Sequence, residues 1–534
     1  MKRRRPLAKL LVAAAAMVML VTACGSASAG NAKAASGGTL TIGWAEEPDT
    51  LNPAQTGSAT TSSIDINIFD TLIYLTKSGQ LRPDLATSWQ TLNSGKTFVF
   101  NLRKGVKFQD GTPFNAAAVV ANVNYIASPD TKSVSALSGL GTCLKATANS
   151  TYQVTILCTS TSAALLNNLT DPSLGMQSPA VLKKYGANLG NHLVGTGAFK
   201  LQSFTPNGTI VLVRNPDYNW APAALNGKGP AKLSKIVYDI VTSAQSRASE
   251  LLSGQAQVIS ETPGIYYNRL KNNSKYQEFG MPNPGMGIFM PFNSSRPPTN
   301  DPMVREAIAM YINKTAVIKT ALQGTFPVLN TILEKGMLGY DASLQGPAFN
   351  PTKAASTLTS DGWQKVNGKW MKGGQPLTLI LNALSTHPEY PLILEAVQGQ
   401  LQQAGLTVTI MNNPVTTWEN VNAAGGMNLT VLQFVGSDSS LVSQWYIPGQ
   451  YYQNWTKVTG APQLVSVLTQ AQSTTDRTQR AKLYEQAQQM ILAKTYEIPI
   501  QVNETLITAK ATVKGMTYNG GGYLDLYQAS VAAG

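Results

Sequence analysis

Hydrophobic residues take every second position along residues 97–103, where Phe98, Phe100 and Leu102 alternate with mostly polar side chains. A repeat of two residues is typical of a half-buried β-strand, so these three side chains are predicted to face the same way. The turn-forming run Asn93-Ser-Gly-Lys96 precedes the strand, and a second glycine turn follows it. The pattern therefore predicts a β-hairpin at this point of the chain.

Further elements follow from the same kind of pattern. Strand alternation recurs at residues 38–44 and 152–157, whereas residues 58–72 predict a helix. Another helix is predicted to begin where Asp301 caps a segment whose first residue is Pro302. Its apolar stripe consists of Val304, Ile308, Tyr311, Ile312 and Val317, and residues 400–410 predict a helix end, a glycine turn and a buried strand.

Length and charge set the class of protein. A chain of 534 residues is too long for one hydrophobic core, so two or three lobes are expected. The formal net charge is +13, but five of the 41 Lys and Arg residues lie within residues 1–23, which hold no acid, so the rest of the chain carries +8. No run of Lys and Arg occurs in that rest, and we therefore expect no nucleic-acid partner.

The N-terminus predicts export. Residues 1–6 are charged, residues 7–23 are apolar, and Val21-Thr-Ala-Cys24 follows the lipobox pattern of a bacterial lipoprotein signal. The apolar run is too short for a comfortable membrane span. We therefore expect cleavage before Cys24, lipidation of that cysteine, and a flexible tether over residues 24–37. The alternatives are an ordinary secretory signal with an incidental cysteine and an uncleaved anchor.

Two further cysteines, Cys143 and Cys158, lie 15 positions apart. A turn is predicted at Asn149-Ser-Thr151 between them, and a hairpin there would place the two thiols opposite one another. Because an exported chain meets an oxidising compartment, we predict a disulfide between them. The alternative is a pair of buried free thiols.

Catalytic and metal-binding patterns are sparse. The two histidines are His192, in a loop before a glycine turn, and His387, in the run His387-Pro-Glu389. Neither forms a zinc pair or a triad signature, and the sequence has no G-x-S-x-G, P-loop or G-x-G-x-x-G motif. We therefore expect neither an enzyme nor a metal site, and no cofactor.

Several longer motifs occur together along the chain. They are Leu81-Arg-Pro-Asp-Leu-Ala-Thr-Ser-Trp89, Leu102-Arg-Lys-Gly-Val-Lys-Phe-Gln-Asp-Gly111, Glu46-Glu-Pro-Asp-Thr-Leu-Asn-Pro53, Val194-Gly-Thr-Gly-Ala-Phe-Lys200 and residues 297–308. Their spelling resembles the signature of the bacterial extracellular solute-binding proteins of the peptide/nickel type, the oligopeptide- and dipeptide-binding family. The resemblance covers residues 38–530, with departures at Asn52, Ala118 and Gln257, where relatives carry Asp.

The resemblance implies an α/β, two-lobed periplasmic-binding-protein fold, with an additional subdomain on the first lobe and two hinge crossings. The expected division is a signal peptide at 1–23, the tether at 24–37, the first lobe at 38–80, 194–284 and 500–534, its extra subdomain at 81–193, and the second lobe at 285–499.

The resemblance also implies a function. We expect a monomeric substrate-binding lipoprotein outside the cytoplasm that captures a short peptide between its lobes and delivers it to the transmembrane subunits of an ABC importer. An oligosaccharide or another polar solute is the alternative cargo, because aromatic residues that could stack on sugars are plentiful. A sensor or interaction lipoprotein without a transport role is the alternative from another class.

Relatives that take peptides use a tryptophan and, three residues later, an aspartate that pairs with the peptide's α-amino group. Counting along the chain places Phe434 and Ser437 at these positions, with Asp438 one place later, where a strand presents its opposite face. The expected ligand-binding residues are Trp44, Glu46, Glu47, Thr262, His387, Trp418, Phe434, Ser437, Asp438 and Trp445.

Overall fold

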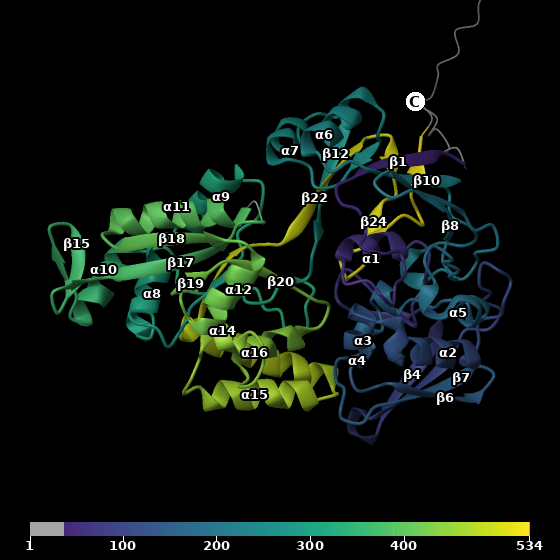
Figure 1. The fold of residues 1–534 in the computed structure, drawn as a ribbon, viewed down its shortest axis with the longest axis horizontal. Helices are drawn as coiled ribbons and strands as arrows, with labels where there is room; N and C mark the ends of the chain where they lie inside the picture. Colours follow the sequence, from purple (N-terminus) through teal and green to yellow (C-terminus); the bar gives the residue numbers. More distant parts are fainter. Residues whose placement is uncertain (1–36, 388, 533–534) are drawn as a thin grey trace, which may run out of the picture.

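The computed structural model describes residues 37–387 and 389–532. The predicted signal peptide, Cys24 and all of the tether except residue 37 lie outside the described residues. The described chain forms two lobes of mixed α/β structure, as predicted (Figure 1). Within this part of the chain, none of the helices has the length and apolar character needed to cross a membrane.

The first lobe is built on a seven-stranded sheet with the order β12-β22-β11-β1-β10-β9-β8. The strands are β1 (Thr39–Trp44), β8 (Phe199–Phe204), β9 (Thr209–Arg214), β10 (Lys235–Ile240), β11 (Val258–Ile259), β12 (Tyr276–Pro282) and β22 (Glu504–Lys510). The strand predicted at residues 38–44 is thus confirmed as β1, whose Leu40 and Ile42 are fully buried. It runs parallel to β10 and β11 at the centre of the sheet.

The predicted hairpin lies in a second, antiparallel sheet with the order β4-β5-β7-β6. Its strands are β4 (Ala86–Leu92), β5 (Thr97–Leu102), β6 (Lys145–Ser150) and β7 (Gln153–Leu157), and helix α2 (Ala116–Ala127) packs against β6 and β7. Phe98, Phe100 and Leu102 are all buried, which confirms the predicted alternation. The β6–β7 hairpin brings Cys143 and Cys158 together, and their sulfurs are bonded in the structure.

The helix predicted at residues 58–72 is shorter than expected. Ser58 caps α1 (Ala59–Asp65) by accepting a hydrogen bond from the amide of Thr60, but the helix ends at Asp65. The reason is a tertiary contact, because the Ile68 carbonyl accepts from the amide of Gly197 at 2.8 Å instead of continuing a helix. A Cβ on Gly197 would lie 2.5 Å from the Ile68 carbonyl carbon, so this approach requires glycine.

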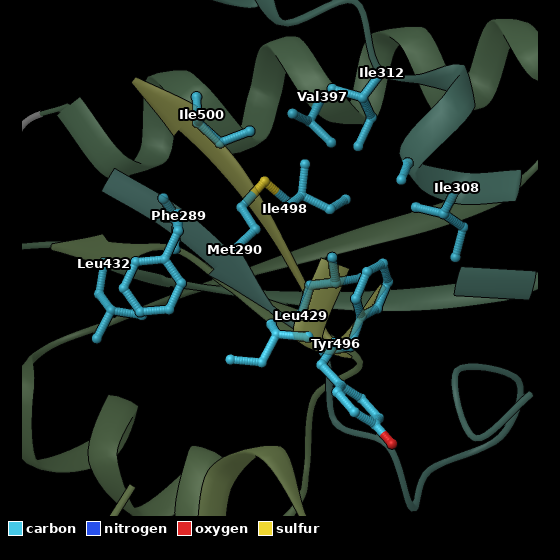
Figure 2. Close-up of a cluster of buried hydrophobic side chains, with 14 of the residues drawn as sticks. Phe289, Met290, Ile308, Ile312, Val397, Leu429, Leu432, Tyr496, Ile498 and Ile500 are labelled. Atoms are coloured by element: carbon cyan, nitrogen blue, oxygen red, sulfur yellow. The ribbon is translucent and has the colours of Figure 1, made fainter. Parts of the chain in front are cut away.

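The core of the second lobe is built on two of its three three-stranded sheets, β18-β17-β19 and β20-β13-β21. Their strands are β13 (Gly285–Pro291), β17 (Thr378–Leu384), β18 (Thr407–Asn413), β19 (Leu429–Thr430), β20 (Leu432–Val435) and β21 (Glu497–Gln501). Figure 2 shows the core between these strands and the helices, to which Phe289, Met290, Ile308, Leu429 and Ile498 contribute buried side chains. The glycine turn predicted before residue 410 is Gly405, which separates α11 (Glu389–Ala404) from β18.

The helix predicted after Asp301 begins as expected but is divided in two. Asp301 accepts from the amide of Met303 at 2.8 Å, and Pro302 is the first residue of α8 (Pro302–Tyr311). The apolar stripe then continues into a separate helix, α9 (Lys314–Leu322). Ile312 has extended dihedral angles and Asn313 caps α9, accepting from the amide of Ala316 at 3.0 Å, so the cap interrupts the pattern.

The remaining elements complete the two lobes. In the first lobe they are β2 (Ile73–Leu75), β3 (Leu81–Pro83), α3 (Ser135–Leu140), α4 (Leu165–Asn168), α5 (Pro179–Tyr185), α6 (Ala244–Ser253), α7 (Gly264–Leu270), β23 (Val513–Lys514), β24 (Thr517–Tyr518), β25 (Leu524–Asp525) and β26 (Ser530–Val531). In the second lobe they are α10 (Pro351–Ser360), β14 (Gln364–Val366), β15 (Lys369–Lys372), β16 (Gln375–Pro376), α12 (Val415–Ala424), α13 (Ser443–Tyr446), α14 (Gln453–Thr456), α15 (Pro462–Ser473) and α16 (Arg477–Ala493).

The chain crosses between the lobes twice, once between β12 and β13 and once between β21 and β22. The two crossings lie side by side, because the amide of Asn283 donates to the carbonyl of Asn503 at 2.9 Å. A pair of adjacent crossings is the arrangement that permits hinge motion of two lobes about one axis. The numerical domain bounds given above stay a prediction.

Candidate ligand-binding cleft

A cavity of about 770 Å³ lies between the two lobes. The first lobe lines it with the end of β1, one side of α1, the segment from α6 to α7 and the start of β22. The crossings contribute Asn283, Gln501 and Asn503. The second lobe lines the cavity with Ala321, Leu322, Gln323, Thr325, Phe326, Thr386, His387, Glu389, Gln433 and Val435. A cleft whose walls come from both lobes is where a ligand would contact both at once.

Four of the predicted ligand-binding residues line this cavity: Trp44, Glu46, Thr262 and His387. Trp44 ends β1 and meets the ring of Tyr238 edge to face, with 5.5 Å between centroids. The Glu46 carboxylate accepts a hydrogen bond from the Thr60 hydroxyl at 2.8 Å. The predicted strand thus ends at the cleft, where the side chains of Trp44 and Glu46 line the cavity.

Thr262 and His387 present polar atoms with no partner among the described residues. Thr262 is 3% exposed, and its hydroxyl has no hydrogen bond, although its amide is bonded to the carbonyl of Leu506. The His387 ring stacks on Tyr390 with 3.8 Å between centroids, and its Nδ1 is also without a partner. Burial lowers the pKa of His387, which keeps the imidazole neutral at neutral pH.

Glu47 is turned away from the cavity. Its carboxylate accepts from the amide of Asn207, in the turn between β8 and β9, and it is not part of the cavity wall. Neighbouring residues after a strand point to different sides, so only one of the two adjacent glutamates enters the cleft.

The predicted aromatic contacts belong to the core of the second lobe. Trp445 is fully buried, and its ring meets Phe289 and Phe434 edge to face. Trp418 is 6% exposed and donates its indole N–H to the hydroxyl of Thr430 at 2.9 Å. The structure therefore does not bring Trp418, Phe434 or Trp445 to the cavity wall, because each is packed in or against the core of the second lobe.

The alternation of β20 explains the position of Phe434. Gln433 and Val435, the residues on either side, line the cavity, so the strand directs Phe434 to the opposite face. Phe434, which was aligned with the relatives' tryptophan, is therefore one residue away along β20 from the positions that face the cavity.

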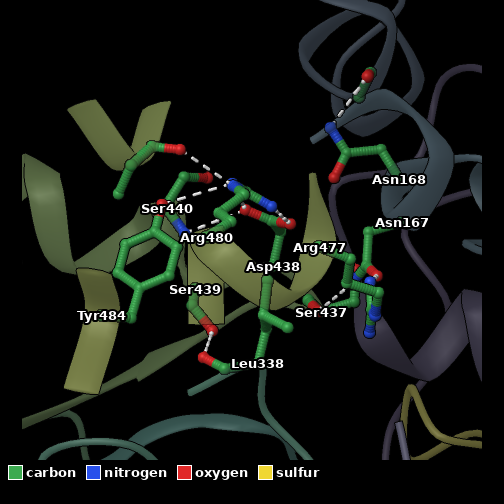
Figure 3. Close-up of polar contacts among 12 residues, drawn as sticks. Asn167, Asn168, Leu338, Ser437, Asp438, Ser439, Ser440, Arg477, Arg480 and Tyr484 are labelled. Atoms are coloured by element: carbon green, nitrogen blue, oxygen red, sulfur yellow. Dashed lines mark hydrogen bonds and ion pairs between the residues drawn. The ribbon is translucent and has the colours of Figure 1, made fainter. Parts of the chain in front are cut away.

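Asp438 is not available to a ligand either. Its carboxylate forms a bidentate ion pair with Arg480, at 2.6 and 2.7 Å, as Figure 3 shows. Burial alone would raise the pKa of Asp438, but the Arg480 guanidinium outweighs burial and holds it below its usual value. The expectation that Asp438 binds a ligand's ammonium is not supported by this geometry, since its charge is already compensated.

Ser437 lies at a contact between the lobes. Its carbonyl accepts from the side chain of Asn167 in α4, and Asn167 also accepts from Arg477 at 2.9 Å (Figure 3). Arg477 further donates to the carbonyl of Gly79 at 2.6 Å. These bonds join the start of α16 to the first lobe, so Ser437 takes part in a lobe contact through its backbone.

Four charged residues of the cleft were missed by the sequence analysis: Arg247, Glu261, Glu389 and Glu504. Glu261 follows β11 with φ at +47°, an uncommon backbone conformation for a non-glycine residue. Glu389 begins α11, in the run that was considered only as a metal or triad motif. Nothing in the sequence marks Glu261 as a cleft residue. His387 and Glu389 are only two positions apart, so the sequence could have indicated that both lie at the cleft.

Carboxylates dominate the electrostatics of the cleft. Burial, followed by repulsion from Glu46, raises the pKa of Glu261 above its usual value despite the opposing effect of Arg247. Burial and repulsion from Glu261 raise the pKa of Glu389 to about 7. Burial also raises the pKa of Glu504. These shifts follow from placing like charges in one partly dehydrated space.

Among the residues that the structure describes, no group of three or more His, Cys, Asp and Glu side chains is placed to hold a metal ion. The residues that line the cavity offer hydrogen bonds, charge and apolar contact to a ligand.

Comparisons with known proteins agree with this geometry. Residues 80–454 match the family model of the bacterial extracellular solute-binding proteins, family 5, over its middle region. The glutathione-binding protein GsiB of Escherichia coli O1:K1 / APEC is 29% identical over 471 residues, which cover 86% of this chain and 88% of GsiB.

Solved structures share the fold. NikA from Brucella suis, in complex with Fe(III)-EDTA, has a TM-score of 0.82 at 22% identity and covers 92% of this chain and 99% of its own. The oligopeptide-binding protein AppA from Bacillus subtilis, in complex with a nonapeptide, has a TM-score of 0.69 at 20% identity and covers 94% and 100%. The chain belongs to the bacterial extracellular solute-binding proteins of family 5.

Proposed function

We propose that the protein is the substrate-binding component of an ABC importer, which captures a short peptide between its lobes and presents it to a membrane permease. The observation that carries this proposal is the cavity of about 770 Å³ walled by both lobes. A ligand there adds contacts to each lobe and therefore shifts the population toward a closed form. No bond is made or broken in this role.

The polar atoms of the cleft support a peptide as cargo. Thr262, Gln501 and Asn503 are at most 6% exposed and line the cavity, yet each has a polar side-chain atom without a partner among the described residues. They supply a hydroxyl, an amide oxygen and an amide NH₂ group, which match the alternating donors and acceptors of a peptide backbone. Because an unpaired buried polar atom is costly, a bound peptide would compensate all three.

Two of the compared proteins bind such molecules, since GsiB binds glutathione and AppA holds a nonapeptide. A sugar cargo has less support, because Trp445 and Trp455, two aromatic side chains that could have stacked on it, are packed in the core, and Phe326 is one of the few aromatic residues in the cavity wall. Trp44 is the aromatic side chain of the first β-strand that remains at the cleft.

The proposal also concerns how the protein is attached to the membrane. We infer that Cys24 carries a lipid that anchors a monomeric protein to the outer face of the cell membrane, close to its permease. The lipobox at residues 21–24 supports the anchor.

Native mass spectrometry of the freshly purified protein tests the cargo. We expect an added mass that fragmentation resolves into amino acids and that is lost after partial unfolding and refolding. A co-purified molecule made of hexose units would show that the cargo is a sugar and not a peptide. A protein that carries nothing and binds no member of a mixed di- to pentapeptide pool would contradict peptide capture.

A further inference from the structure

We propose that the cleft selects organic cations, with a ligand ammonium or guanidinium group held between Glu46 and Glu261 of the first lobe and Glu389 of the second. This inference rests on the proposed capture of a solute in the cleft, and it specifies the charge of that solute.

The first argument is the balance of charge in the cavity wall. The described wall contains four carboxylates, from Glu46, Glu261, Glu389 and Glu504, and one guanidinium, from Arg247. The ion pairs found in the described part of the chain are Lys353–Glu306, Lys372–Asp361 and Arg480–Asp438. None of the four glutamates of the cleft is therefore compensated by a protein cation at contact distance.

Arg247 offsets part of this negative charge, but its guanidinium is already hydrogen-bonded to the backbone. It is 2% exposed, and it donates to the carbonyls of Val241, Thr242, Ser260 and Glu261 at 2.7 to 3.1 Å. These bonds occupy Nε and both terminal nitrogens. Arg247 thus holds the loop after β11 in place and is poorly placed to receive a ligand carboxylate.

The second argument is independent of the acids. Thr262 follows Glu261 directly, is 3% exposed and has an unpartnered hydroxyl in the cavity wall. Gln501 Oε1 and Asn503 Nδ2 are also without partners, and both residues line the same cavity. Buried polar atoms without partners mark a place where a ligand completes the hydrogen bonding. The carboxylates and these polar residues thus line one cavity.

The third argument links the charge to closure. Repulsion from Glu261, in the first lobe, contributes to the raised pKa of Glu389, in the second. Moving the lobes together increases this repulsion unless a cation lies between them. A cation would therefore favour the closed form, whereas an anionic ligand would meet carboxylates from both sides. Glutathione, with two carboxylates and one ammonium, is poorly matched to such a cleft.

Isothermal titration with matched tripeptides tests the inference. The probes are Ala-Lys-Ala, Ala-Gln-Ala and Ala-Glu-Ala, the N-acetylated form of each, glutathione, and spermidine as a cation without peptide bonds. We expect Ala-Lys-Ala to bind at least about tenfold more tightly than Ala-Gln-Ala, with Ala-Glu-Ala and glutathione weakest. The acetylated probes tell whether the α-ammonium or the side-chain ammonium supplies the charge.

Variants locate the site. Glu261→Gln and Glu389→Gln should each reduce the preference for lysine over glutamine by about tenfold or more. Glu395→Gln, an exposed change on the same helix as Glu389, is the matched control and should leave the preference unchanged. The two test variants lie in different lobes, so if one fails to fold, the other still decides the question.

The outcomes separate this inference from the proposed function. Equal affinity for the lysine, glutamine and glutamate peptides would overturn cation selection and leave peptide capture intact. Binding of spermidine alone would keep the cation site and overturn peptide capture. Binding of none of the probes, or an unaltered preference in both glutamate variants, would overturn the inference.

Discussion

Arg480 and Asp438 form a bidentate ion pair inside the second lobe, with Nη1–Oδ2 and Nη2–Oδ1 distances of 2.7 and 2.6 Å. Their side chains are 3% and 5% exposed. Arg480 also donates from Nε to the carbonyl of Ala471, and Asp438 accepts from the amide of Ser440. The pair thus ties the segment after β20 to α15 and α16, beside the contact between the lobes.

Asp438→Asn should therefore affect stability before binding. Leaving Arg480 buried without a counter-charge should lower the free energy of unfolding by about 3–5 kcal/mol. Urea denaturation measures this, with Lys353→Gln as the control, because the Lys353–Glu306 pair is 61% and 38% exposed and should contribute at most about 1 kcal/mol. If Asp438→Asn leaves the stability unchanged but abolishes ligand binding, Asp438 is a ligand-binding residue after all.

The bond between Cys143 and Cys158 predicts the behaviour of the thiols. The folded mature protein should react with no alkylating reagent at these positions until it is reduced, and mass spectrometry after iodoacetamide treatment shows this. The disulfide closes a loop whose ends are 15 residues apart. The double substitution Cys143→Ser with Cys158→Ser opens this loop and should lower the free energy of unfolding by about 3 kcal/mol in the chain-entropy model. Two freely reactive thiols in the folded protein would refute the pairing.

Glu497 predicts part of the pH dependence of stability. It is 1% exposed, it accepts a hydrogen bond from Tyr446, and burial raises its pKa from 4.5 to about 8. The folded chain keeps a proton that the unfolded chain releases over this interval, so the free energy of unfolding falls as pH rises from 4.5 to about 8.

Glu497→Gln imitates the protonated acid and should remove this contribution, so that the variant gains stability relative to the native protein as pH rises through the interval. Urea denaturation at several pH values compares the two. Other buried acids, such as Glu334 with its pKa raised to about 8, leave a residual slope of the same sign in both proteins. Parallel curves for variant and native protein would show that Glu497 is ionised in the fold.

Cys24→Ser tests the anchor. Without the thiol no diacylglycerol can be attached, so the variant should be released into the medium or remain as uncleaved precursor. Membrane fractionation followed by immunoblotting distinguishes these forms from the anchored protein. If the variant partitions to the membrane as the native protein does, Cys24 is not the lipidation site.

Local patterns predicted the elements well where no distant segment interferes. The alternation around Phe100 and the cap at Asp301 depend on neighbours in the sequence, and both occur in the structure as expected. The helix after Ser58 was overestimated because Ile68 bonds to Gly197, far along the chain. Such a tertiary contact leaves no periodic signal in the residues that it redirects.

The site was predicted in part for the same reason. Trp44 and Glu46 follow directly from a strand that the sequence shows, and both line the cleft. Asp438 was chosen by counting along a motif, but its partner Arg480 comes from a helix that the motif does not include. Glu261 and Glu389 come from different lobes and line one cavity only after both lobes have folded, so neither segment alone indicates a shared site.

Small-angle X-ray scattering of the protein with and without a bound peptide tests lobe capture most directly. Because the cavity is walled by both lobes, a peptide that binds there is expected to reduce the radius of gyration. Thermal unfolding of the same samples verifies occupancy, since a ligand at about 100 times its Kd stabilises the folded state by about 2.7 kcal/mol. A peptide that stabilises the protein to this extent and leaves the radius of gyration unaltered would contradict capture by closure of the two lobes.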